Sequence, residues 1–287
     1  MPLTVERGIK YNGGMPELPE VETIVRCLRP RLVGLEVQSI RLIFLPIVRN
    51  REKNYIRKFV GRRVTGLRRR GKMILVDFSG GLTMVVHLKM TGQLLMCSSR
   101  APLDKHTHCV FTFRAGDEEL RFRDVRKFGF MLGVKTAELE QRREFRDLGP
   151  EPLTVDLTTF IGRIRSRRGR LKSLLLSQKT IAGLGNIYAD EILFESGLDP
   201  RTEVFRLGPR RLERLFRAVL KILNEAIAFK GTTVRDYRDG EGHEGLFQSR
   251  LKVYGREGRP CPRCGKSIRR IRVSGRSTHY CPRCQRR

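Results

Sequence analysis

The sequence predicts an α+β protein, on three observations along the chain. Runs rich in β-branched and aromatic residues fill residues 36–136, and several short strands at close spacing are typical of a β-sandwich or barrel. Helical periodicity replaces this pattern in four later segments, 157–166, 171–178, 186–196 and 209–229. Two Cys-x2-Cys pairs near the end of the chain predict a small hairpin around a metal ion.

The first helix is predicted over residues 16–30, PELPEVETIVRCLRP. Apolar residues recur there at helical spacing, and Glu20 and Glu22 stand in the first turn, where the helix dipole favours acids. Seven strand-like runs follow, at 37–44, 61–71, 72–78, 82–90, 108–114, 119–125 and 128–134. The Gly/Pro stretch LGPEPL at 148–153 predicts a domain boundary, and the glycine-rich segment 230–250 predicts a mobile loop of the kind that forms lids.

The charge points to a polyanionic partner. Lys and Arg number 59 against 30 Asp and Glu, a net charge of +29, and nucleic acid rewards each basic contact with its phosphates. An Arg-rich composition on a solvated face is the alternative. No apolar stretch approaches the ~18 residues that span a bilayer, and the first residues lack the apolar core of a signal peptide. We therefore expect a cytosolic globular protein.

The seven cysteines fall into two sets. Cys27, Cys97 and Cys109 are scattered in or beside apolar stretches and are expected to be small buried side chains. The others form two Cys-x2-Cys pairs whose separation fits one tetrahedral zinc ion with four thiolate ligands: Cys261, Cys264, Cys281 and Cys284. Disulfides are the alternative, but a cytosolic chain keeps its thiols reduced. Residues 258–287 carry ten Lys and Arg and no carboxylate, so we expect this hairpin to bind an anion.

Several blocks in register resemble the bacterial formamidopyrimidine-DNA glycosylases. They are MPELPEVE (15–22), RGK (70–72), HLKMTG (87–92), DVRKFG (124–129), GLGNIYADE (183–191), VYGR (253–256) and GRSTHYCP (275–282). The resemblance runs from Pro16 to the C-terminus. The sister group of endonuclease VIII type usually opens Pro-Glu-Gly-Pro-Glu, so Leu18 favours the branch that acts on oxidised purines.

The resemblance implies a fold and an activity. The fold is a two-layer β-sandwich with a flanking helix (16–147), a helical helix–two-turn–helix domain with a lesion-recognition loop (148–250) and a zinc β-hairpin (251–287), after an extension at 1–15. The activity is excision of 8-oxoguanine and formamidopyrimidines from duplex DNA, then β,δ-elimination at the abasic site. The resemblance also implies a monomer that needs one structural zinc ion and acts on damaged double-stranded DNA in the bacterial cytoplasm, at the nucleoid.

Four residues are candidates for the chemistry. An N-terminal Pro16 is a secondary amine, and its attack on sugar C1′ gives an iminium that cannot lose a proton to become a neutral imine. An α-amino group titrates near 8, so a useful fraction is unprotonated at neutral pH. By resemblance Glu17 moves protons at the sugar and base, Lys72 donates a proton during β-elimination, and Arg276 clamps phosphates and assists δ-elimination. Taken alone, Pro16 reads as the first residue of a helix and Lys72 as a surface charge.

Fourteen residues precede Met15, which departs from the family pattern. While they remain attached, the Pro16 nitrogen is an amide and is not a nucleophile. A wrongly assigned start codon, later processing and loss of lyase activity are the three explanations, and we expect translation from Met15. A non-catalytic DNA-binding zinc protein and an enzyme preferring oxidised pyrimidines are the alternative functions.

Further residues are implied to contact DNA. The resemblance places His106, Arg167, Lys172, Asn186 and Tyr188 on the DNA, and Ser177 stands where many relatives have Asp. It makes three more the wedge that fills the space left by a flipped base: Met90, Arg126 and Phe128. By residue type alone, Met90 and Phe128 read as core and His106 as structural.

Overall fold

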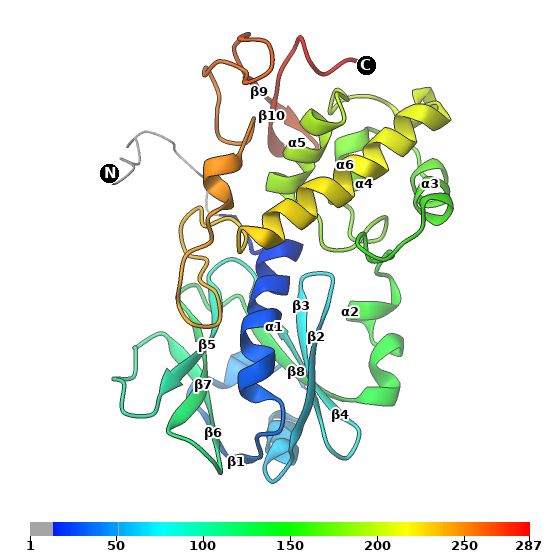
Figure 1. Cartoon of the computed structure of the whole chain (residues 1–287). Helices are drawn as coiled ribbons and strands as arrows, with labels where there is room; N and C mark the ends of the chain where they lie inside the picture. The colour runs from blue at the N-terminus through cyan, green and yellow to red at the C-terminus, as the bar shows by residue number, and fades with distance from the viewer. Residues whose placement is uncertain (1–13, 51) are drawn as a thin grey trace.

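The computed structural model describes residues 14–50 and 52–287, and it has the predicted α+β architecture (Figure 1). Residues 1–13 of the predicted extension lie outside this part. The strands are β1 (Val37–Leu42), β2 (Val64–Arg70), β3 (Met73–Phe78), β4 (Leu82–His87), β5 (Gly92–Ser98), β6 (Thr107–Phe113), β7 (Glu118–Asp124), β8 (Phe130–Lys135), β9 (Arg269–Val273) and β10 (Arg276–Tyr280). The α-helices are α1 (Leu18–Leu32), α2 (Arg143–Arg146), α3 (Leu157–Arg165), α4 (Leu171–Leu176), α5 (Asn186–Glu195) and α6 (Pro209–Ala228). Short 3-10 turns cover Leu45–Ile47, Lys53–Phe59, Thr136–Gln141, Val204–Arg206 and Phe247–Arg250.

Two four-stranded antiparallel sheets form the N-terminal sandwich. Their strand orders are β1-β6-β7-β5 and β2-β3-β4-β8. Side chains of β3 alternate between two cores, because Ile74 and Val76 enter the core shared with the first sheet while Met73 and Leu75 pack under the segment 136–146. This sheet is therefore buried on both faces, which explains the nearly continuous apolar runs in its sequence.

The fourth strand ends earlier than predicted, and a strand was missed. The run 82–90 was predicted as one strand, but β4 stops at His87 because Lys89 adopts φ 53° and the chain turns. Gly92 closes this turn, since a Cβ there would lie 2.4 Å from the Leu88 carbonyl oxygen. β5 then begins at Gly92 and pairs with β7. The turn places Met90 at the end of the sandwich that faces the helices.

Helix α1 joins the sandwich to the helical part. Val21, Ile24 and Leu28 belong to the core of the sandwich, whereas Leu18 packs into the helical core, and its N–H donates to the Gly183 carbonyl (3.0 Å). The chain passes from sheets to helices at 148–153. There Glu151 accepts the N–H of Gly71 at 2.6 Å, which ties this connection to the β2–β3 turn.

Helices α3 to α6 form a second core, and the zinc hairpin of β9 and β10 lies against α5 (Figure 1). The hairpin turn has positive φ at Ser274 and Gly275, the backbone of a two-residue hairpin loop. The segment 230–250, predicted as a mobile loop, docks on α1 with Tyr237 and Asp239 buried. None of the described helices combines the length and the apolar character required to cross a membrane.

Candidate active site

One cavity of about 360 Å³ opens between the sandwich, the helices and the zinc hairpin. It brings together three of the four predicted catalytic residues, Glu17, Lys72 and Arg276, although they come from distant parts of the chain. Pro16 is buried and is not part of the wall; the two residues before it, Gly14 and Met15, line the cavity instead. The other lining residues are Met90, Leu176, Leu184, Gly185, Asn186, Ile187, Tyr254, Gly255, Arg270, Arg272, Gly275, Ser277 and His279.

Glu17 is a buried carboxylate held at the N-terminus of α5. It accepts the backbone N–H groups of Gly185 (2.7 Å), Ile187 (2.9 Å) and, more distantly, Tyr188 (3.4 Å). Burial raises the pKa of Glu17 to about 7, against the opposing effects of Lys72 and of these N–H donors. A carboxyl group with that pKa is partly protonated near neutral pH, so it can both give and take a proton.

Gly185 allows Glu17 and Lys72 to approach each other. A Cβ on Gly185 would lie 2.4 Å from Glu17 Oε1 and 2.7 Å from Lys72 Nζ, so no larger residue fits. The two glycines of Gly183-Leu184-Gly185 serve different purposes. Gly183 has φ 87°, a backbone conformation that glycine adopts easily, whereas Gly185 is needed for space.

Lys72 is presented by the turn between β2 and β3, where Gly71 has φ 57°. Burial lowers the pKa of Lys72, and Arg276 and Lys89 lower it further, while Glu17 raises it. Within residues 14–50 and 52–287 its ammonium group makes no hydrogen bond. An amine with a lowered pKa and free N–H groups in a cavity is suited to proton transfer, so the surface-charge interpretation is wrong for Lys72.

Behind Glu17 lies a second buried carboxylate that the sequence analysis did not propose for the site. Glu20 accepts N–H groups from Glu17 (2.8 Å) and Thr232 (2.7 Å) and the hydroxyl of Tyr188. Burial raises the pKa of Glu20. Its position in the first helical turn was interpreted only through the helix dipole, and nothing in the sequence indicates its distant partners.

Two side chains that were predicted to contact DNA are buried instead. The Tyr188 side chain is fully buried, and its hydroxyl bonds to Glu20 and Thr232, so it supports the site from within. Lys172 is also fully buried, in a 2.6 Å ion pair with Asp190. Neither side chain reaches the surface, so the prediction that they contact DNA is wrong.

The remaining predicted contacts stay accessible. Arg276 is exposed at the start of β10, and its guanidinium makes no ion pair with any residue that the structure describes. Asn186 lines the cavity, and its buried Oδ1 has no hydrogen-bond donor in the described chain. His106 and Arg167 are partly exposed but lie away from the cavity wall.

The three predicted wedge residues lie together beside the cavity. An Arg126 Nη1 atom is 3.1 Å from Met90 Sδ, and the guanidinium lies 4.8 Å from the centre of the Phe128 ring. Phe128 is 51% exposed, which excludes the core interpretation for that residue. Asp124 fixes the loop by accepting the N–H groups of Gly129 (2.7 Å) and Arg126 (3.2 Å). An exposed aromatic ring held on an ordered loop is available for stacking.

The four paired cysteines form a compact group. Cys261 Sγ is 3.8 Å from Cys284 Sγ, and Cys264 Sγ is 3.5 Å from Cys281 Sγ. Tetrahedral zinc with Zn–S bonds of about 2.3 Å requires sulfurs about 3.8 Å apart, so the group fits that ion. N–H groups of Arg263 and Cys284 point at Cys261 and Cys281, as in a metal-binding knuckle. Of the other three thiols, Cys109 is buried as predicted, whereas Cys27 and Cys97 are only partly buried.

The sequence and the arrangement of its domains match a known protein family. Residues 15–131 match the formamidopyrimidine-DNA glycosylase N-terminal domain, and residues 148–238 match the H2TH domain of the same glycosylases. A curated formamidopyrimidine-DNA glycosylase of Desulforamulus reducens is 48% identical over 260 residues, which cover 89% of this chain and 94% of the relative. The chain belongs to the formamidopyrimidine-DNA glycosylase family. The glycosylase of Moorella thermoacetica is similar at 47% identity over 259 residues, with 89% and 94% coverage.

Solved structures of this glycosylase family are also similar. A Lactococcus lactis Fpg in complex with DNA containing an abasic site matches with a TM-score of 0.87 and 35% identity, over 94% of this chain and all of that one. A second Lactococcus lactis Fpg structure, with N7-benzyl-Fapy-dG DNA, matches equally well, at TM-score 0.87 and 35% identity over 95% and 100%. Residues 258–287 match the zinc finger found in FPG and IleRS, and the four cysteines there hold a structural zinc ion.

Proposed function

We propose that this glycosylase excises oxidised purines from duplex DNA and then cleaves the abasic site by β,δ-elimination, with Pro16 as the nucleophile. The observation that carries the proposal is the convergence of Glu17, Lys72, Asn186 and Arg276 on one cavity beside Pro16. Relatives named formamidopyrimidine-DNA glycosylase and solved complexes with abasic and Fapy-dG DNA support the same substrate class.

The first step needs a nucleophile and a proton carrier. The Pro16 amine attacks C1′ of the damaged nucleotide, the glycosidic bond breaks, and the base leaves with its bonding electrons. Glu17, whose pKa is near 7, is placed to move protons at the sugar and the base during this exchange. The bound amine then loses its proton, the C1′–O4′ bond of the sugar ring breaks, and O4′ leaves as a hydroxyl after it takes up a proton. The covalent product is an open-chain iminium, which is an electron sink for the following step.

Elimination then uses the other side of the cavity. Loss of a C2′ proton expels the 3′ phosphate, and a second elimination expels the 5′ phosphate. Lys72 is the proton donor of the first elimination, since it has free N–H groups and a lowered pKa. Arg276 holds the phosphates with its planar guanidinium and assists the second. Asn186 contacts the backbone beside the lesion.

Base flipping requires the wedge. Met90 fills the space left by the base, Arg126 hydrogen-bonds to the orphaned partner, and Phe128 stacks on it. The contact between Met90 and Arg126 supports a joint insertion of these side chains. His106 and Arg167 are proposed as outlying backbone contacts.

The nucleophile requires a chain that begins at Pro16. In the structure Gly14 and Met15 line the cavity, and the Pro16 nitrogen is part of a peptide bond. Gly14 and Met15 therefore occupy space that the damaged nucleotide needs. We propose that the active form lacks residues 1–15 and acts in the bacterial cytoplasm, with functional parts at 16–147, 148–250 and 251–287.

Borohydride trapping tests this proposal. The chain 16–287 should form a covalent complex with 8-oxoguanine or abasic duplexes, and the chain 1–287 should form none while still binding DNA. Equal trapping by both forms would identify a lysine nucleophile and overturn the role of Pro16. Faster excision from a thymine glycol duplex than from an 8-oxoguanine duplex would instead favour the oxidised-pyrimidine alternative.

A further inference from the structure

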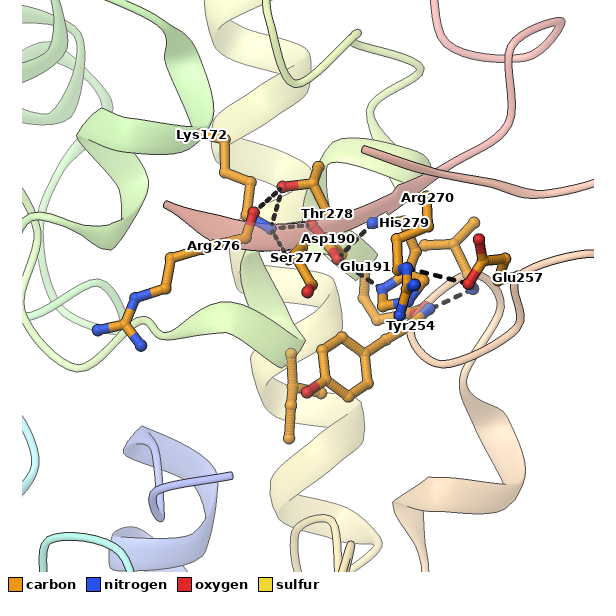
Figure 2. A network of polar contacts seen from close by, with 12 residues as sticks. Lys172, Asp190, Glu191, Tyr254, Glu257, Arg270, Arg276, Ser277, Thr278 and His279 are labelled. Atoms are coloured by element: carbon orange, nitrogen blue, oxygen red, sulfur yellow. Dashed lines mark hydrogen bonds and ion pairs between the residues drawn. The ribbon is translucent and has the colours of Figure 1, made fainter. Parts of the chain in front are cut away.

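A buried ion pair lies beneath the zinc hairpin (Figure 2). Lys172 in α4 and Asp190 in α5 both have fully buried side chains, and their charged atoms are 2.6 Å apart. The ammonium group also donates to the Ser277 carbonyl (2.9 Å) and to Thr278 Oγ1 (2.8 Å). A lysine has three N–H donors, and each has a partner here. Lys172 therefore joins two helices to the strand that begins with Arg276.

The two acids of α5 hold the zinc hairpin at two places. Asp190 Oδ2 accepts the N–H of His279 at 2.8 Å and lies 3.3 Å from Nδ1 of its ring. Glu191 accepts the N–H groups of residues 252–254 at 2.8–2.9 Å. The N-terminus of the same helix holds Glu17. One rigid helix thus sets the distance between the catalytic carboxylate and the hairpin.

The tip of the hairpin is fixed on both sides of Arg276. Ser173, the neighbour of Lys172, contacts Ser274 with 2.5 Å between their hydroxyl oxygens. On the other side Thr278 Oγ1 bonds to both Lys172 and the Arg276 carbonyl. The backbone of Arg276 is anchored before and after the residue, while its side chain extends away from the ion pair in Figure 2.

We propose that Lys172 and Asp190 are positioning residues that place Arg276 for the second elimination. This inference rests on the proposed role of Arg276. Removing one partner leaves an uncompensated buried charge, which the fold relieves by local movement. The strand carrying Arg276 is the element bound to both partners, so we expect it to move. A displacement of about 1 Å at a catalytic group can cost up to 10²-fold in rate.

The test uses the chain 16–287 with Lys172→Met, which has similar length and no charge. On an abasic duplex we expect the ratio of δ- to β-elimination product to fall about tenfold, while single-turnover excision of 8-oxoguanine falls far less. Lys179→Met is the matched control, since Lys179 pairs with Asp147 at the surface, and it should leave the ratio unchanged. Zinc content should stay the same in both variants.

A double-variant cycle separates positioning from general damage. If Lys172 acts through Arg276, Lys172→Met should add no further loss of δ-product in an Arg276→Ala background. Lys172→Met combined with Asp190→Asn should recover part of the ratio, because no buried charge is left unpaired. Two results would overturn the inference. One is a double variant, Lys172→Met with Arg276→Ala, whose loss of δ-product equals the product of the two single losses. The other is an unchanged δ/β ratio in Lys172→Met.

Milder variants keep the inference testable if Lys172→Met fails to fold. Thr278→Val removes one hydrogen bond to Lys172 and should lower the δ/β ratio about two- to fivefold in the same direction; an unchanged ratio would count against the inference. The proposed function fails separately, if the wild-type chain excises no damaged base. If Arg276→Ala leaves δ-elimination intact, the role of Arg276 fails together with this inference.

Discussion

Two lysines next to carboxylates show how the cavity wall differs from the ion pair under the hairpin: Lys72 is partly buried and lines the cavity, whereas Lys172 is fully buried. Lys172 has all three N–H groups bonded and faces Asp190 at 2.6 Å. Lys72 faces Glu17 across Gly185, and in the described chain its ammonium group has no hydrogen bond. Burial lowers the pKa of both lysines, so the pKa shift does not distinguish them. The difference lies in their donors: a lysine whose donors are all bonded fixes structure, whereas free donors in a cavity leave a proton to transfer.

The largest expected effect on DNA affinity comes from loss of the zinc ion. Cys281→Ser should release the zinc ion and unfold the hairpin, because ligand binding and folding of so small a unit are coupled. Affinity for an abasic duplex should fall by about a hundredfold or more, since the phosphate contacts of the hairpin are lost together. Zinc content and Kd measure this, with the partly buried Cys97→Ser as control. Full affinity in a zinc-free variant would refute the structural role of the metal.

The next largest effect is expected from the wedge residues beside the cavity, and it concerns the rate of base excision. Met90→Ala should slow excision from duplex DNA by about ten- to a hundredfold, because unstacking costs a few kcal/mol that the inserted side chain offsets. Cleavage of a preformed abasic site should change little, because the base is already absent. Arg126→Ala should flatten the discrimination between cytosine and adenine opposite the lesion. If Met90→Ala slows both reactions in the same ratio, Met90 only packs the loop.

The raised pKa of Glu17 should also make the stability of the protein depend on pH. The pKa of Glu17 is about 7 in the fold against an ordinary value of 4.5, so between these values the folded state binds a proton that the unfolded chain does not. The free energy of unfolding should therefore fall as pH rises from about 4.5 to 7, by about 3 kcal/mol at most, and then level off. Urea unfolding at pH 5 to 8 measures this. If a Glu17→Gln variant shows the same dependence of unfolding free energy on pH, a group other than Glu17 causes it.

The smallest expected effect is on the salt dependence of DNA binding, which separates the partly exposed Arg167 from the buried Lys172. Arg167→Ala should reduce the slope of log K against log salt by about one, the value for one lost phosphate contact. Lys172→Met should leave the slope unchanged, since its ammonium group never reaches DNA. An equal change in both would mean that the buried lysine is accessible in the complex and would break the comparison.

The sequence predicted the parts of the site better than their roles. The sheets, the four helices and the four-cysteine site follow from periodicity and spacing, and the conjunction of Glu17, Lys72 and Arg276 in one cavity agrees with the resemblance. Burial could not be predicted, because a lysine in a short helix looks like a surface charge. The partners that enclose Lys172 lie up to 106 positions later in the chain.

The same limit explains the other corrections. Tyr188 follows a motif typical of DNA contact, yet its hydroxyl bonds to Glu20, 168 positions earlier. The run 82–90 contains no Gly or Pro that would end a strand, and only the positive φ of Lys89 shows that the chain turns. Local sequence pattern does not show which distant segments come into contact, nor the backbone conformation of a single residue. The first decides the role of Tyr188, and the second decides where the strand ends.

The most direct test of the account compares Lys72→Met with Lys172→Met in the chain 16–287, on a preformed abasic duplex under single-turnover conditions. Lys72→Met should slow β-elimination by about 10²–10⁴-fold, the contribution of a general acid. Lys172→Met should keep that rate within about threefold, well below the tenfold that 1.4 kcal/mol represents. Equal losses of β-elimination in the two variants, or full activity in Lys72→Met, would contradict the distinction between a chemical and a structural lysine.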